Sequence, residues 1–208
     1  MSQPNGVPTF EQPEAPVDRM VIEGLLAALN AGDRSDSGKV VLDLLQSAPA
    51  RAPQFETAPW SAGDLTGDWV VTPDTRDDAV AIYLHGRRFQ HDEPAEVTAA
   101  PLSQALGMPV LLLHYRLSPA NRYPAALEDV LSAIRSVRKL RPASWIVLVG
   151  HSAGGTLALS ALTEMSKTGE PMPAAAAIVS AIADFTFTAA THQSNADSGL
   201  CPSVPLGV

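Results

Sequence analysis

The chain has 208 residues, of which 46% are hydrophobic and 17% are charged, which is ordinary for one globular domain with a substantial core. Its net charge of −8 argues against nucleic acid or an anionic membrane as the main partner. With Cys201 as the one cysteine, an internal disulfide and a cysteine-based metal cluster are excluded.

The first 50 residues are expected to be distinct from the rest. Their polar start, rich in Pro, Gln and Glu, predicts disorder and has no basic segment followed by an apolar stretch, so it is not expected to be a secretory signal. Apolar residues at helical spacing then predict two short amphipathic helices. These residues are Met20, Val21, Leu25, Ala28 and Leu29 in the first helix, and Val40, Val41, Leu44 and Leu45 in the second.

A Pro/Ala-rich linker is predicted around residues 48–55, and residues 51–208 are expected to form the core domain. No apolar run reaches the ~20 residues that span a bilayer. A cytoplasmic protein without a membrane span is therefore the expectation.

From about residue 66 onward, short apolar runs alternate with segments long enough for helices. One helix is predicted through Glu96, Ala99, Leu102 and Leu106, a second opens at Pro124, and a third follows Ser152. Because the apolar runs lack polar alternation, a mostly parallel sheet flanked by helices is predicted. The predicted strands are 68–72, 78–85, 109–115, 144–150 and 174–182.

The chemistry is predicted to centre on Gly150-His151-Ser152-Ala153-Gly154, which joins a predicted strand to a predicted helix. This G-x-S-x-G pattern is typical of a nucleophile elbow, a sharp turn that exposes a serine hydroxyl. Glycine is needed at both flanks because side chains there would collide, and the N–H of Ala153 can face an oxyanion at the helix N-terminus. The alternative is a glycine-lined turn with a helix-capping serine.

Two further motifs make the chain resemble the hormone-sensitive-lipase-like branch of the α/β-hydrolases. The chain reads YLHGRRF, YRLSPANRYPAALED and GHSAGGTLA where that family reads YLHGGGF, YRLAPE followed by PAALED, and GDSAGGNLA. The resemblance spans about residues 66 to 200. It implies the α/β-hydrolase fold, with the N-terminal helices as part of a cap over the acyl pocket.

The resemblance also implies a serine hydrolase of small-molecule carboxylic esters or lactones, with no metal and no organic cofactor. Ser152 would be the catalytic nucleophile, and the N–H groups of Gly86, Arg87 and Ala153 would form the oxyanion hole. Arg87 and Arg88 stand where the family has glycines. Their side chains would either crowd the pocket or clamp a substrate carboxylate, and both readings stay open.

In this fold the triad acid and base follow the serine, about a hundred residues later in the family. This chain ends at Val208, so the resemblance implies the N-terminal two-thirds of the enzyme, lacking the last strands, the acid and the base. After Ser152 the histidine is His192, which is expected on a surface segment. The acids there are Glu164, Glu170, Asp184 and Asp197, and Asp184 corresponds to a family position beside the mouth of the active site.

Three of the other histidines are expected to be structural. His151 should be directed away from Ser152 by the elbow, His85 should brace its loop, and His114 should cap its strand. Without a base a serine hydroxyl is a poor nucleophile, so the chain is expected to be nearly inactive. The run 174–182 would then be an exposed apolar edge, open to self-association.

Two other functions remain open. One is a non-catalytic ligand-binding protein that keeps the pocket, as plant gibberellin receptors do within the family. The other is a transferase that uses the same serine, which the sequence does not separate from a hydrolase.

Overall fold

The computed structural model describes residues 53–190, except 74, 87–88, 90–92, 96, 143, 187 and 189. The predicted N-terminal helices, Arg87, Arg88, His192, Asp197 and Cys201 lie outside the described residues. Every described helix and strand belongs to one compact unit that includes Arg51–Phe187.

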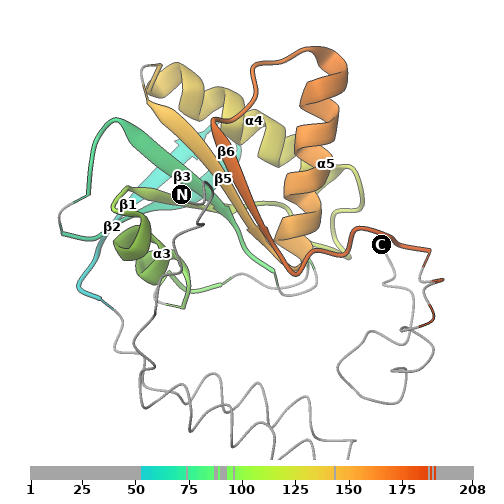
Figure 1. Cartoon of the computed structure of the whole chain (residues 1–208), viewed down its shortest axis with the longest axis horizontal. Coiled ribbons are helices and arrows are strands. Elements are labelled where there is room, and N and C mark those ends of the chain that lie inside the picture. The colour runs from blue at the N-terminus through green and yellow to red at the C-terminus, as the bar shows by residue number, and fades with distance from the viewer. Residues whose placement is uncertain are drawn as a thin grey trace, which may run out of the picture. The chain divides into compact units, whose positions relative to one another are not determined.

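The core is a six-stranded sheet with the order β1-β2-β4-β3-β5-β6 (Figure 1). β1 pairs antiparallel with β2 and β2 with β4, whereas β4, β3, β5 and β6 run parallel, as the unbroken apolar runs predicted. The strands are β1 (Glu56–Ala62), β2 (Leu65–Val71), β3 (Ala79–Leu84), β4 (Val110–His114), β5 (Trp145–His151) and β6 (Ala175–Val179).

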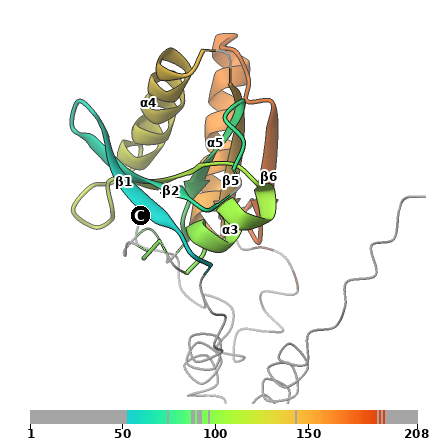
Figure 2. The same ribbon diagram turned by 90° about the vertical axis from the view of Figure 1, so that its left-hand side faces the viewer.

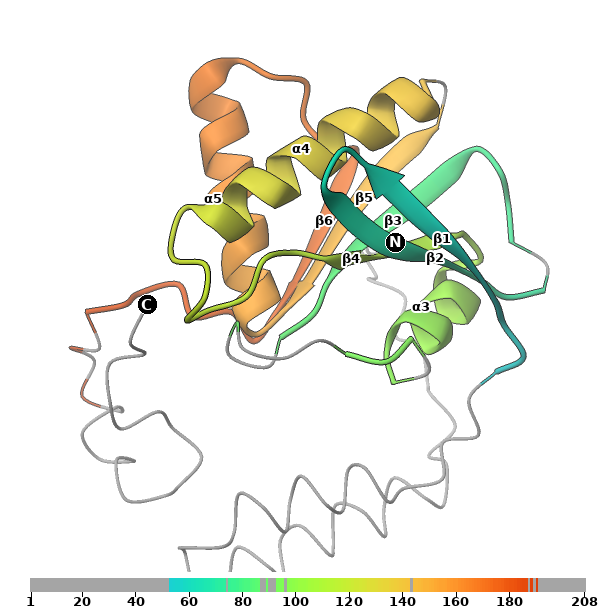
Figure 3. The same ribbon diagram turned by 180° about the vertical axis from the view of Figure 1, so that it is seen from behind.

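Helices cover both faces of the sheet (Figures 2 and 3). α3 (Ala99–Leu106) lies on one face, and α4 (Ala125–Leu140) and α5 (Ala153–Thr168) lie on the other. β3 is buried along its whole length because Val80, Ile82 and Leu84 face α4 and α5 while Ala81 and Tyr83 face α3. A strand covered twice has no solvent-facing side chains, which explains its lack of polar alternation.

β1 is a strand that the sequence did not predict. Six of its seven residues are not buried, Trp60 being the exception, so it lacks an apolar pattern. Its backbone pairs with β2 through a tight turn at Gly63, where φ is +63°. The predicted strand 68–72 corresponds to β2, and the three predicted helices are α3, α4 and α5.

β6 is the outermost strand on its side of the sheet. All its residues except the half-buried Ile178 are exposed, and Val179 is 50% exposed. The exposed apolar edge expected from the sequence is therefore present in the described part of the chain.

Candidate active site

Ser152 stands at a sharp corner between β5 and α5, so the predicted strand–turn–helix is present. Its φ of 52° and ψ of −117° place a non-glycine residue in a sparsely populated backbone region. Such strain is retained only where the surrounding structure enforces it, and it concentrates at functional sites. Here the N–H of Ser152 donates to the carbonyl oxygen of Val179 at 2.8 Å, which holds the corner against the end of β6.

The two flanking glycines are required because the backbone packs tightly around the corner. A Cβ on Gly150 would lie 2.8 Å from the Cα of Gly155. A Cβ on Gly154 would overlap the carbonyl oxygen of Leu84 and lie 2.5 Å from that of His85. Real Cβ atoms do not approach so closely, so the first turn of α5 can meet the end of β3 only with glycine at these positions.

The loop after β3 lies directly beside Ser152. A Cβ on Gly86 would lie 3.1 Å from the Cβ of Ser152, and 3.1 Å and 3.2 Å from the carbonyl oxygen and Nδ1 of His151. Ala153 is the first residue of α5, where helix N–H groups have no carbonyl partner within the helix. The structure therefore brings Gly86, Ser152 and Ala153 together, whereas Arg87 lies outside the described residues.

His85 and His114 make structural contacts. His85 is fully buried, and its ring stacks on Tyr115 with centroids 4.4 Å apart. The Tyr115 hydroxyl donates to the His85 carbonyl oxygen at 2.7 Å, which braces the loop that leads to Gly86. His114 ends β4, and its Nε2 lies 3.2 Å from Oδ2 of Asp68 on β2.

His151 is exposed at the end of β5. Its ring borders Gly86, as Ser152 does, but no hydrogen bond joins His151 to Ser152 among the described residues. The geometry therefore does not make His151 a partner of the serine hydroxyl in this conformation.

The described acids after Ser152 have other partners. Asp184 accepts hydrogen bonds from the Thr186 N–H at 2.8 Å and from its hydroxyl at 2.9 Å. The Oε2 of Glu164 lies 4.0 Å from the Nζ of Lys167. Glu170 pairs with Arg135 at 2.6 Å, and the hydrogen bond from Arg135 lowers the pKa of Glu170.

Thr156 is a site-forming residue that the sequence reasoning missed. Its hydroxyl donates to the Ile182 carbonyl oxygen at 2.9 Å and accepts from the Ile182 N–H at 3.1 Å. Because Thr156 lies one turn after Ser152, these bonds tie the segment after β6 to the helix that carries the serine. No local signal identifies such a contact, since the two residues are 26 positions apart.

The motif YRLSPANRYPAALED is held by an ion pair across its length. Buried Asp129 accepts from the Arg116 N–H at 2.8 Å and from its Nε at 2.9 Å. The hydrogen bond to Asp129 raises the pKa of Arg116. This pair anchors the loop after β4 to the first turns of α4 and so places the loop beside α5.

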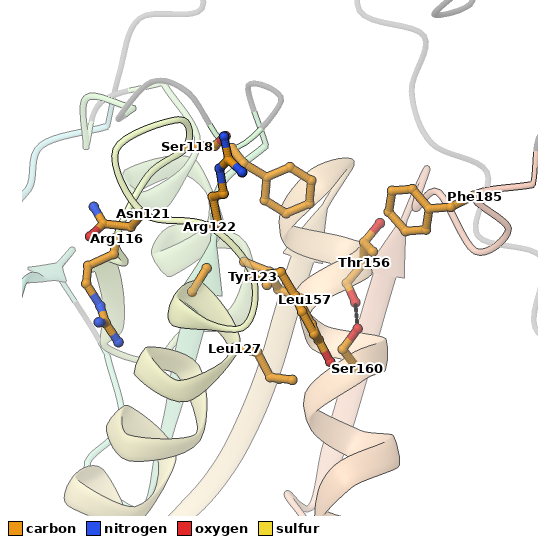
Figure 4. Close-up of a pocket in the computed structure, with 12 residues that line it drawn as sticks. Arg116, Ser118, Asn121, Arg122, Tyr123, Leu127, Thr156, Leu157, Ser160 and Phe185 are labelled. Atoms are coloured by element: carbon orange, nitrogen blue, oxygen red, sulfur yellow. Dashed lines mark hydrogen bonds between the residues drawn. The ribbon is translucent and has the colours of Figure 1, made fainter. Parts of the chain in front are cut away.

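That loop forms one side of a pocket of about 360 Å³ next to α5 (Figure 4). Loop, helix and post-β6 residues all contribute to its lining, which is mainly apolar. The lining residues are Phe89, Arg116, Ser118, Asn121, Arg122, Tyr123, Ala126, Leu127, Thr156, Leu157, Ser160 and Phe185.

Comparison with known proteins agrees with this fold. A family model of the α/β-hydrolase fold matches residues 81–204, and the chain belongs to that family. Within this fold, the chain is similar to solved esterases of the hormone-sensitive-lipase-like branch. A solved esterase of the bacterial hormone-sensitive lipase family is 29% identical with a TM-score of 0.67, over 89% of this chain and 64% of that one.

Two curated relatives are an acetyl-hydrolase and a carboxylesterase by name. The chain is 36% identical to an acetyl-hydrolase of Streptomyces hygroscopicus over 135 residues, which cover 64% of this chain and 45% of that protein. It is 27% identical to a carboxylesterase of Mycobacterium tuberculosis over 72% of this chain and 51% of that protein. The chain thus spans about half the length of these relatives. Among the described residues, no helix is long and apolar enough to cross a membrane.

Proposed function

We propose that this chain carries the nucleophile and oxyanion hole of a hydrolase of carboxylic esters or lactones, which acts through an acyl-enzyme on Ser152. The strained backbone of Ser152 between β5 and α5, beside Gly86, is the observation that carries the proposal. The names of two relatives, an acetyl-hydrolase and a carboxylesterase, support the same reaction class.

In the proposed reaction, the Ser152 Oγ attacks the ester carbonyl carbon and gives its proton to a base. The carbonyl electron pair moves to oxygen, and the N–H groups of Gly86, Arg87 and Ala153 hold the oxyanion. Arg87 keeps a backbone N–H, as a glycine would. Collapse of this tetrahedral intermediate expels the alcohol, which takes the proton from the base and leaves the acyl group on Ser152. Water then attacks the acyl carbon and releases the carboxylic acid from Ser152.

The base is the part of this reaction for which the described residues offer no candidate. His85 and His114 are engaged elsewhere, and His151 makes no described hydrogen bond to Ser152. We therefore propose that the chain alone is nearly inactive. An oxyanion hole and binding alone leave an acceleration of about 10³-fold over water in triad-deleted proteases.

Hydrolysis of p-nitrophenyl acetate by the chain, by Ser152→Ala and by Ser160→Ala tests both statements. Ser160 is a matched control because it lies on the same helix and its hydroxyl bonds the Thr156 carbonyl oxygen. We expect slow p-nitrophenol release of about one equivalent that Ser152→Ala abolishes and Ser160→Ala keeps. Equal release by Ser152→Ala would exclude Ser152, and rapid turnover would show that a base is present.

A non-catalytic ligand-binding protein is the second candidate function, and the pocket beside α5 favours it. A fluorophosphonate separates the two, because it labels only a serine that can attack. Labelling of the chain but not of Ser152→Ala supports the hydrolase. Ligand binding by a chain that a fluorophosphonate labels no faster than it labels Ser152→Ala supports the binding protein, whereas slow labelling that depends on Ser152 supports a hydrolase that lacks its base.

We also propose that β6 mediates self-association. Its backbone edge is unpaired among the described strands, and residues 174–183 contain no charge and no proline. Edge strands normally carry such residues to block pairing with another chain. A second copy can therefore add its own β6 without like-charge repulsion at the strand.

A further inference from the structure

The pocket in Figure 4 lies beside the serine corner but does not include it. Neither Ser152 nor the oxyanion residues Gly86 and Ala153 line it. Thr156 and Leu157 do, from the next turn of α5. A ligand in this pocket would therefore lie against α4, α5 and the loop between β4 and α4, with no contact to the nucleophile required.

The floor of the pocket is apolar and suits the apolar part of a ligand. Phe89, Leu127 and Leu157 are each less than 10% exposed and belong to the core on the α4 and α5 side of the sheet. At the rim, Tyr123 is 74% exposed and Phe185 is 45% exposed. Large aromatic side chains that stay exposed around an apolar hollow are typical of a binding site.

The rim also carries an unneutralised positive charge. Of the two arginines in the lining, Arg116 is paired with Asp129 and Glu128. Arg122 forms no ion pair with any acid in the described part of the chain. Figure 4 shows Arg122 and Phe185 on opposite sides of the pocket. In a chain with a net charge of −8, a free guanidinium beside an apolar hollow complements an anionic ligand.

We propose that this pocket binds a small amphipathic carboxylate, whose alkyl chain lies on Phe89, Leu127 and Leu157 and whose carboxylate pairs with Arg122. One guanidinium matches one carboxylate in a bidentate pair, and about 360 Å³ suits a small ligand. The inference goes beyond the chemistry of Ser152, because it needs neither the nucleophile nor the oxyanion hole. The acid product of the proposed reaction belongs to the same chemical class.

Calorimetric titration of the full chain with octanoate tests the proposal. We expect one octanoate per chain, bound about tenfold more weakly by Arg122→Gln, since a hydrogen bond to a charged group is lost. Lys139→Gln is the matched control, because it removes a charge from the exposed far end of α4 and should leave the affinity unchanged. Ser152→Ala should also bind as the unchanged chain does, which separates this site from the proposed hydrolase.

Two further measurements separate the apolar contribution to octanoate binding from the contribution of the Arg122 charge. Ser160→Phe places a ring in the pocket and should abolish binding, while circular dichroism checks that the variant is folded. 1-Octanol, which lacks the charge, should bind Arg122→Gln and the unchanged chain equally. Failure of the chain to bind octanoate, or equal octanoate affinity for Arg122→Gln, would overturn the proposal.

Discussion

Gly154 and Leu84 meet so closely that a Cβ on Gly154 would overlap the Leu84 carbonyl oxygen. This contact brings the first turn of α5 against the end of β3. It thereby sets Ser152 next to the loop that contains Gly86. The proximity of nucleophile and oxyanion loop thus depends on the absence of one side chain.

Gly154→Ala should destabilise the chain by about 3 kcal/mol or more, because the methyl group forces α5 away from β3. Gly63→Ala is the control: nothing lies within 4 Å of its Cβ position, so only the positive φ opposes the substitution. That strain costs about 1 kcal/mol. Urea denaturation of the two variants measures the difference, and equal losses would contradict the packing argument.

Ser152→Gly should be more stable than Ser152→Ala by about 1 kcal/mol, since glycine adopts φ of 52° without the strain that a Cβ causes. The serine side chain makes no capping hydrogen bond, so removing its hydroxyl should cost little stability. Thermal denaturation of both variants checks this order. The reverse order would mean that the corner is unstrained.

Asp129→Asn should destabilise the chain by about 1–3 kcal/mol, because the Arg116 N–H and guanidinium lose their charged acceptor. Its neighbour Glu128 pairs with the same arginine but is 60% exposed. Glu128→Gln should therefore cost less than about 0.5 kcal/mol. Similar losses in urea denaturation would contradict the assignment of Asp129 as the anchor of the loop.

The Arg135–Glu170 pair should contribute stability that depends on pH. The hydrogen bond from Arg135 lowers the pKa of Glu170 in the folded chain. Because the unfolded chain binds the Glu170 proton more tightly, the pair stabilises the folded chain near neutral pH, where the carboxylate is ionised. It should be lost as the pH falls through the folded pKa. Glu170→Gln should thus lower stability slightly at pH 7, and this loss should shrink as the pH falls below the ordinary carboxyl range, as compared by urea denaturation.

Ala176→Lys in β6 should reduce self-association, because an edge lysine disfavours pairing with a second edge. In size-exclusion chromatography, the unchanged chain should elute with an apparent mass above its 21.8 kDa. The apparent mass of the variant should lie closer to 21.8 kDa. Ala120→Lys adds the same charge to an exposed loop and should not change elution. A monomeric unchanged chain would refute association through β6.

Much of the fold could be predicted because its signals are local. Pro124 directly precedes α4, and the apolar runs mark β3 to β6. β1 was missed because its residues are mostly exposed and its strand geometry comes from pairing with β2. Likewise, the Thr156–Ile182 and His85–Tyr115 contacts join residues far apart in sequence, so no local pattern predicts them.

The sequence by itself determined the serine corner, because glycines at 150 and 154 and a strand–helix junction are local requirements of that turn. Only the tertiary structure decided what surrounds it. Packing placed Gly86 beside Ser152, paired His85 and His114 with other partners, and opened an apolar pocket with Arg122 at its rim. These relationships arise when distant segments pack together, so they follow from the folded sheet and its helices rather than from any one stretch of chain.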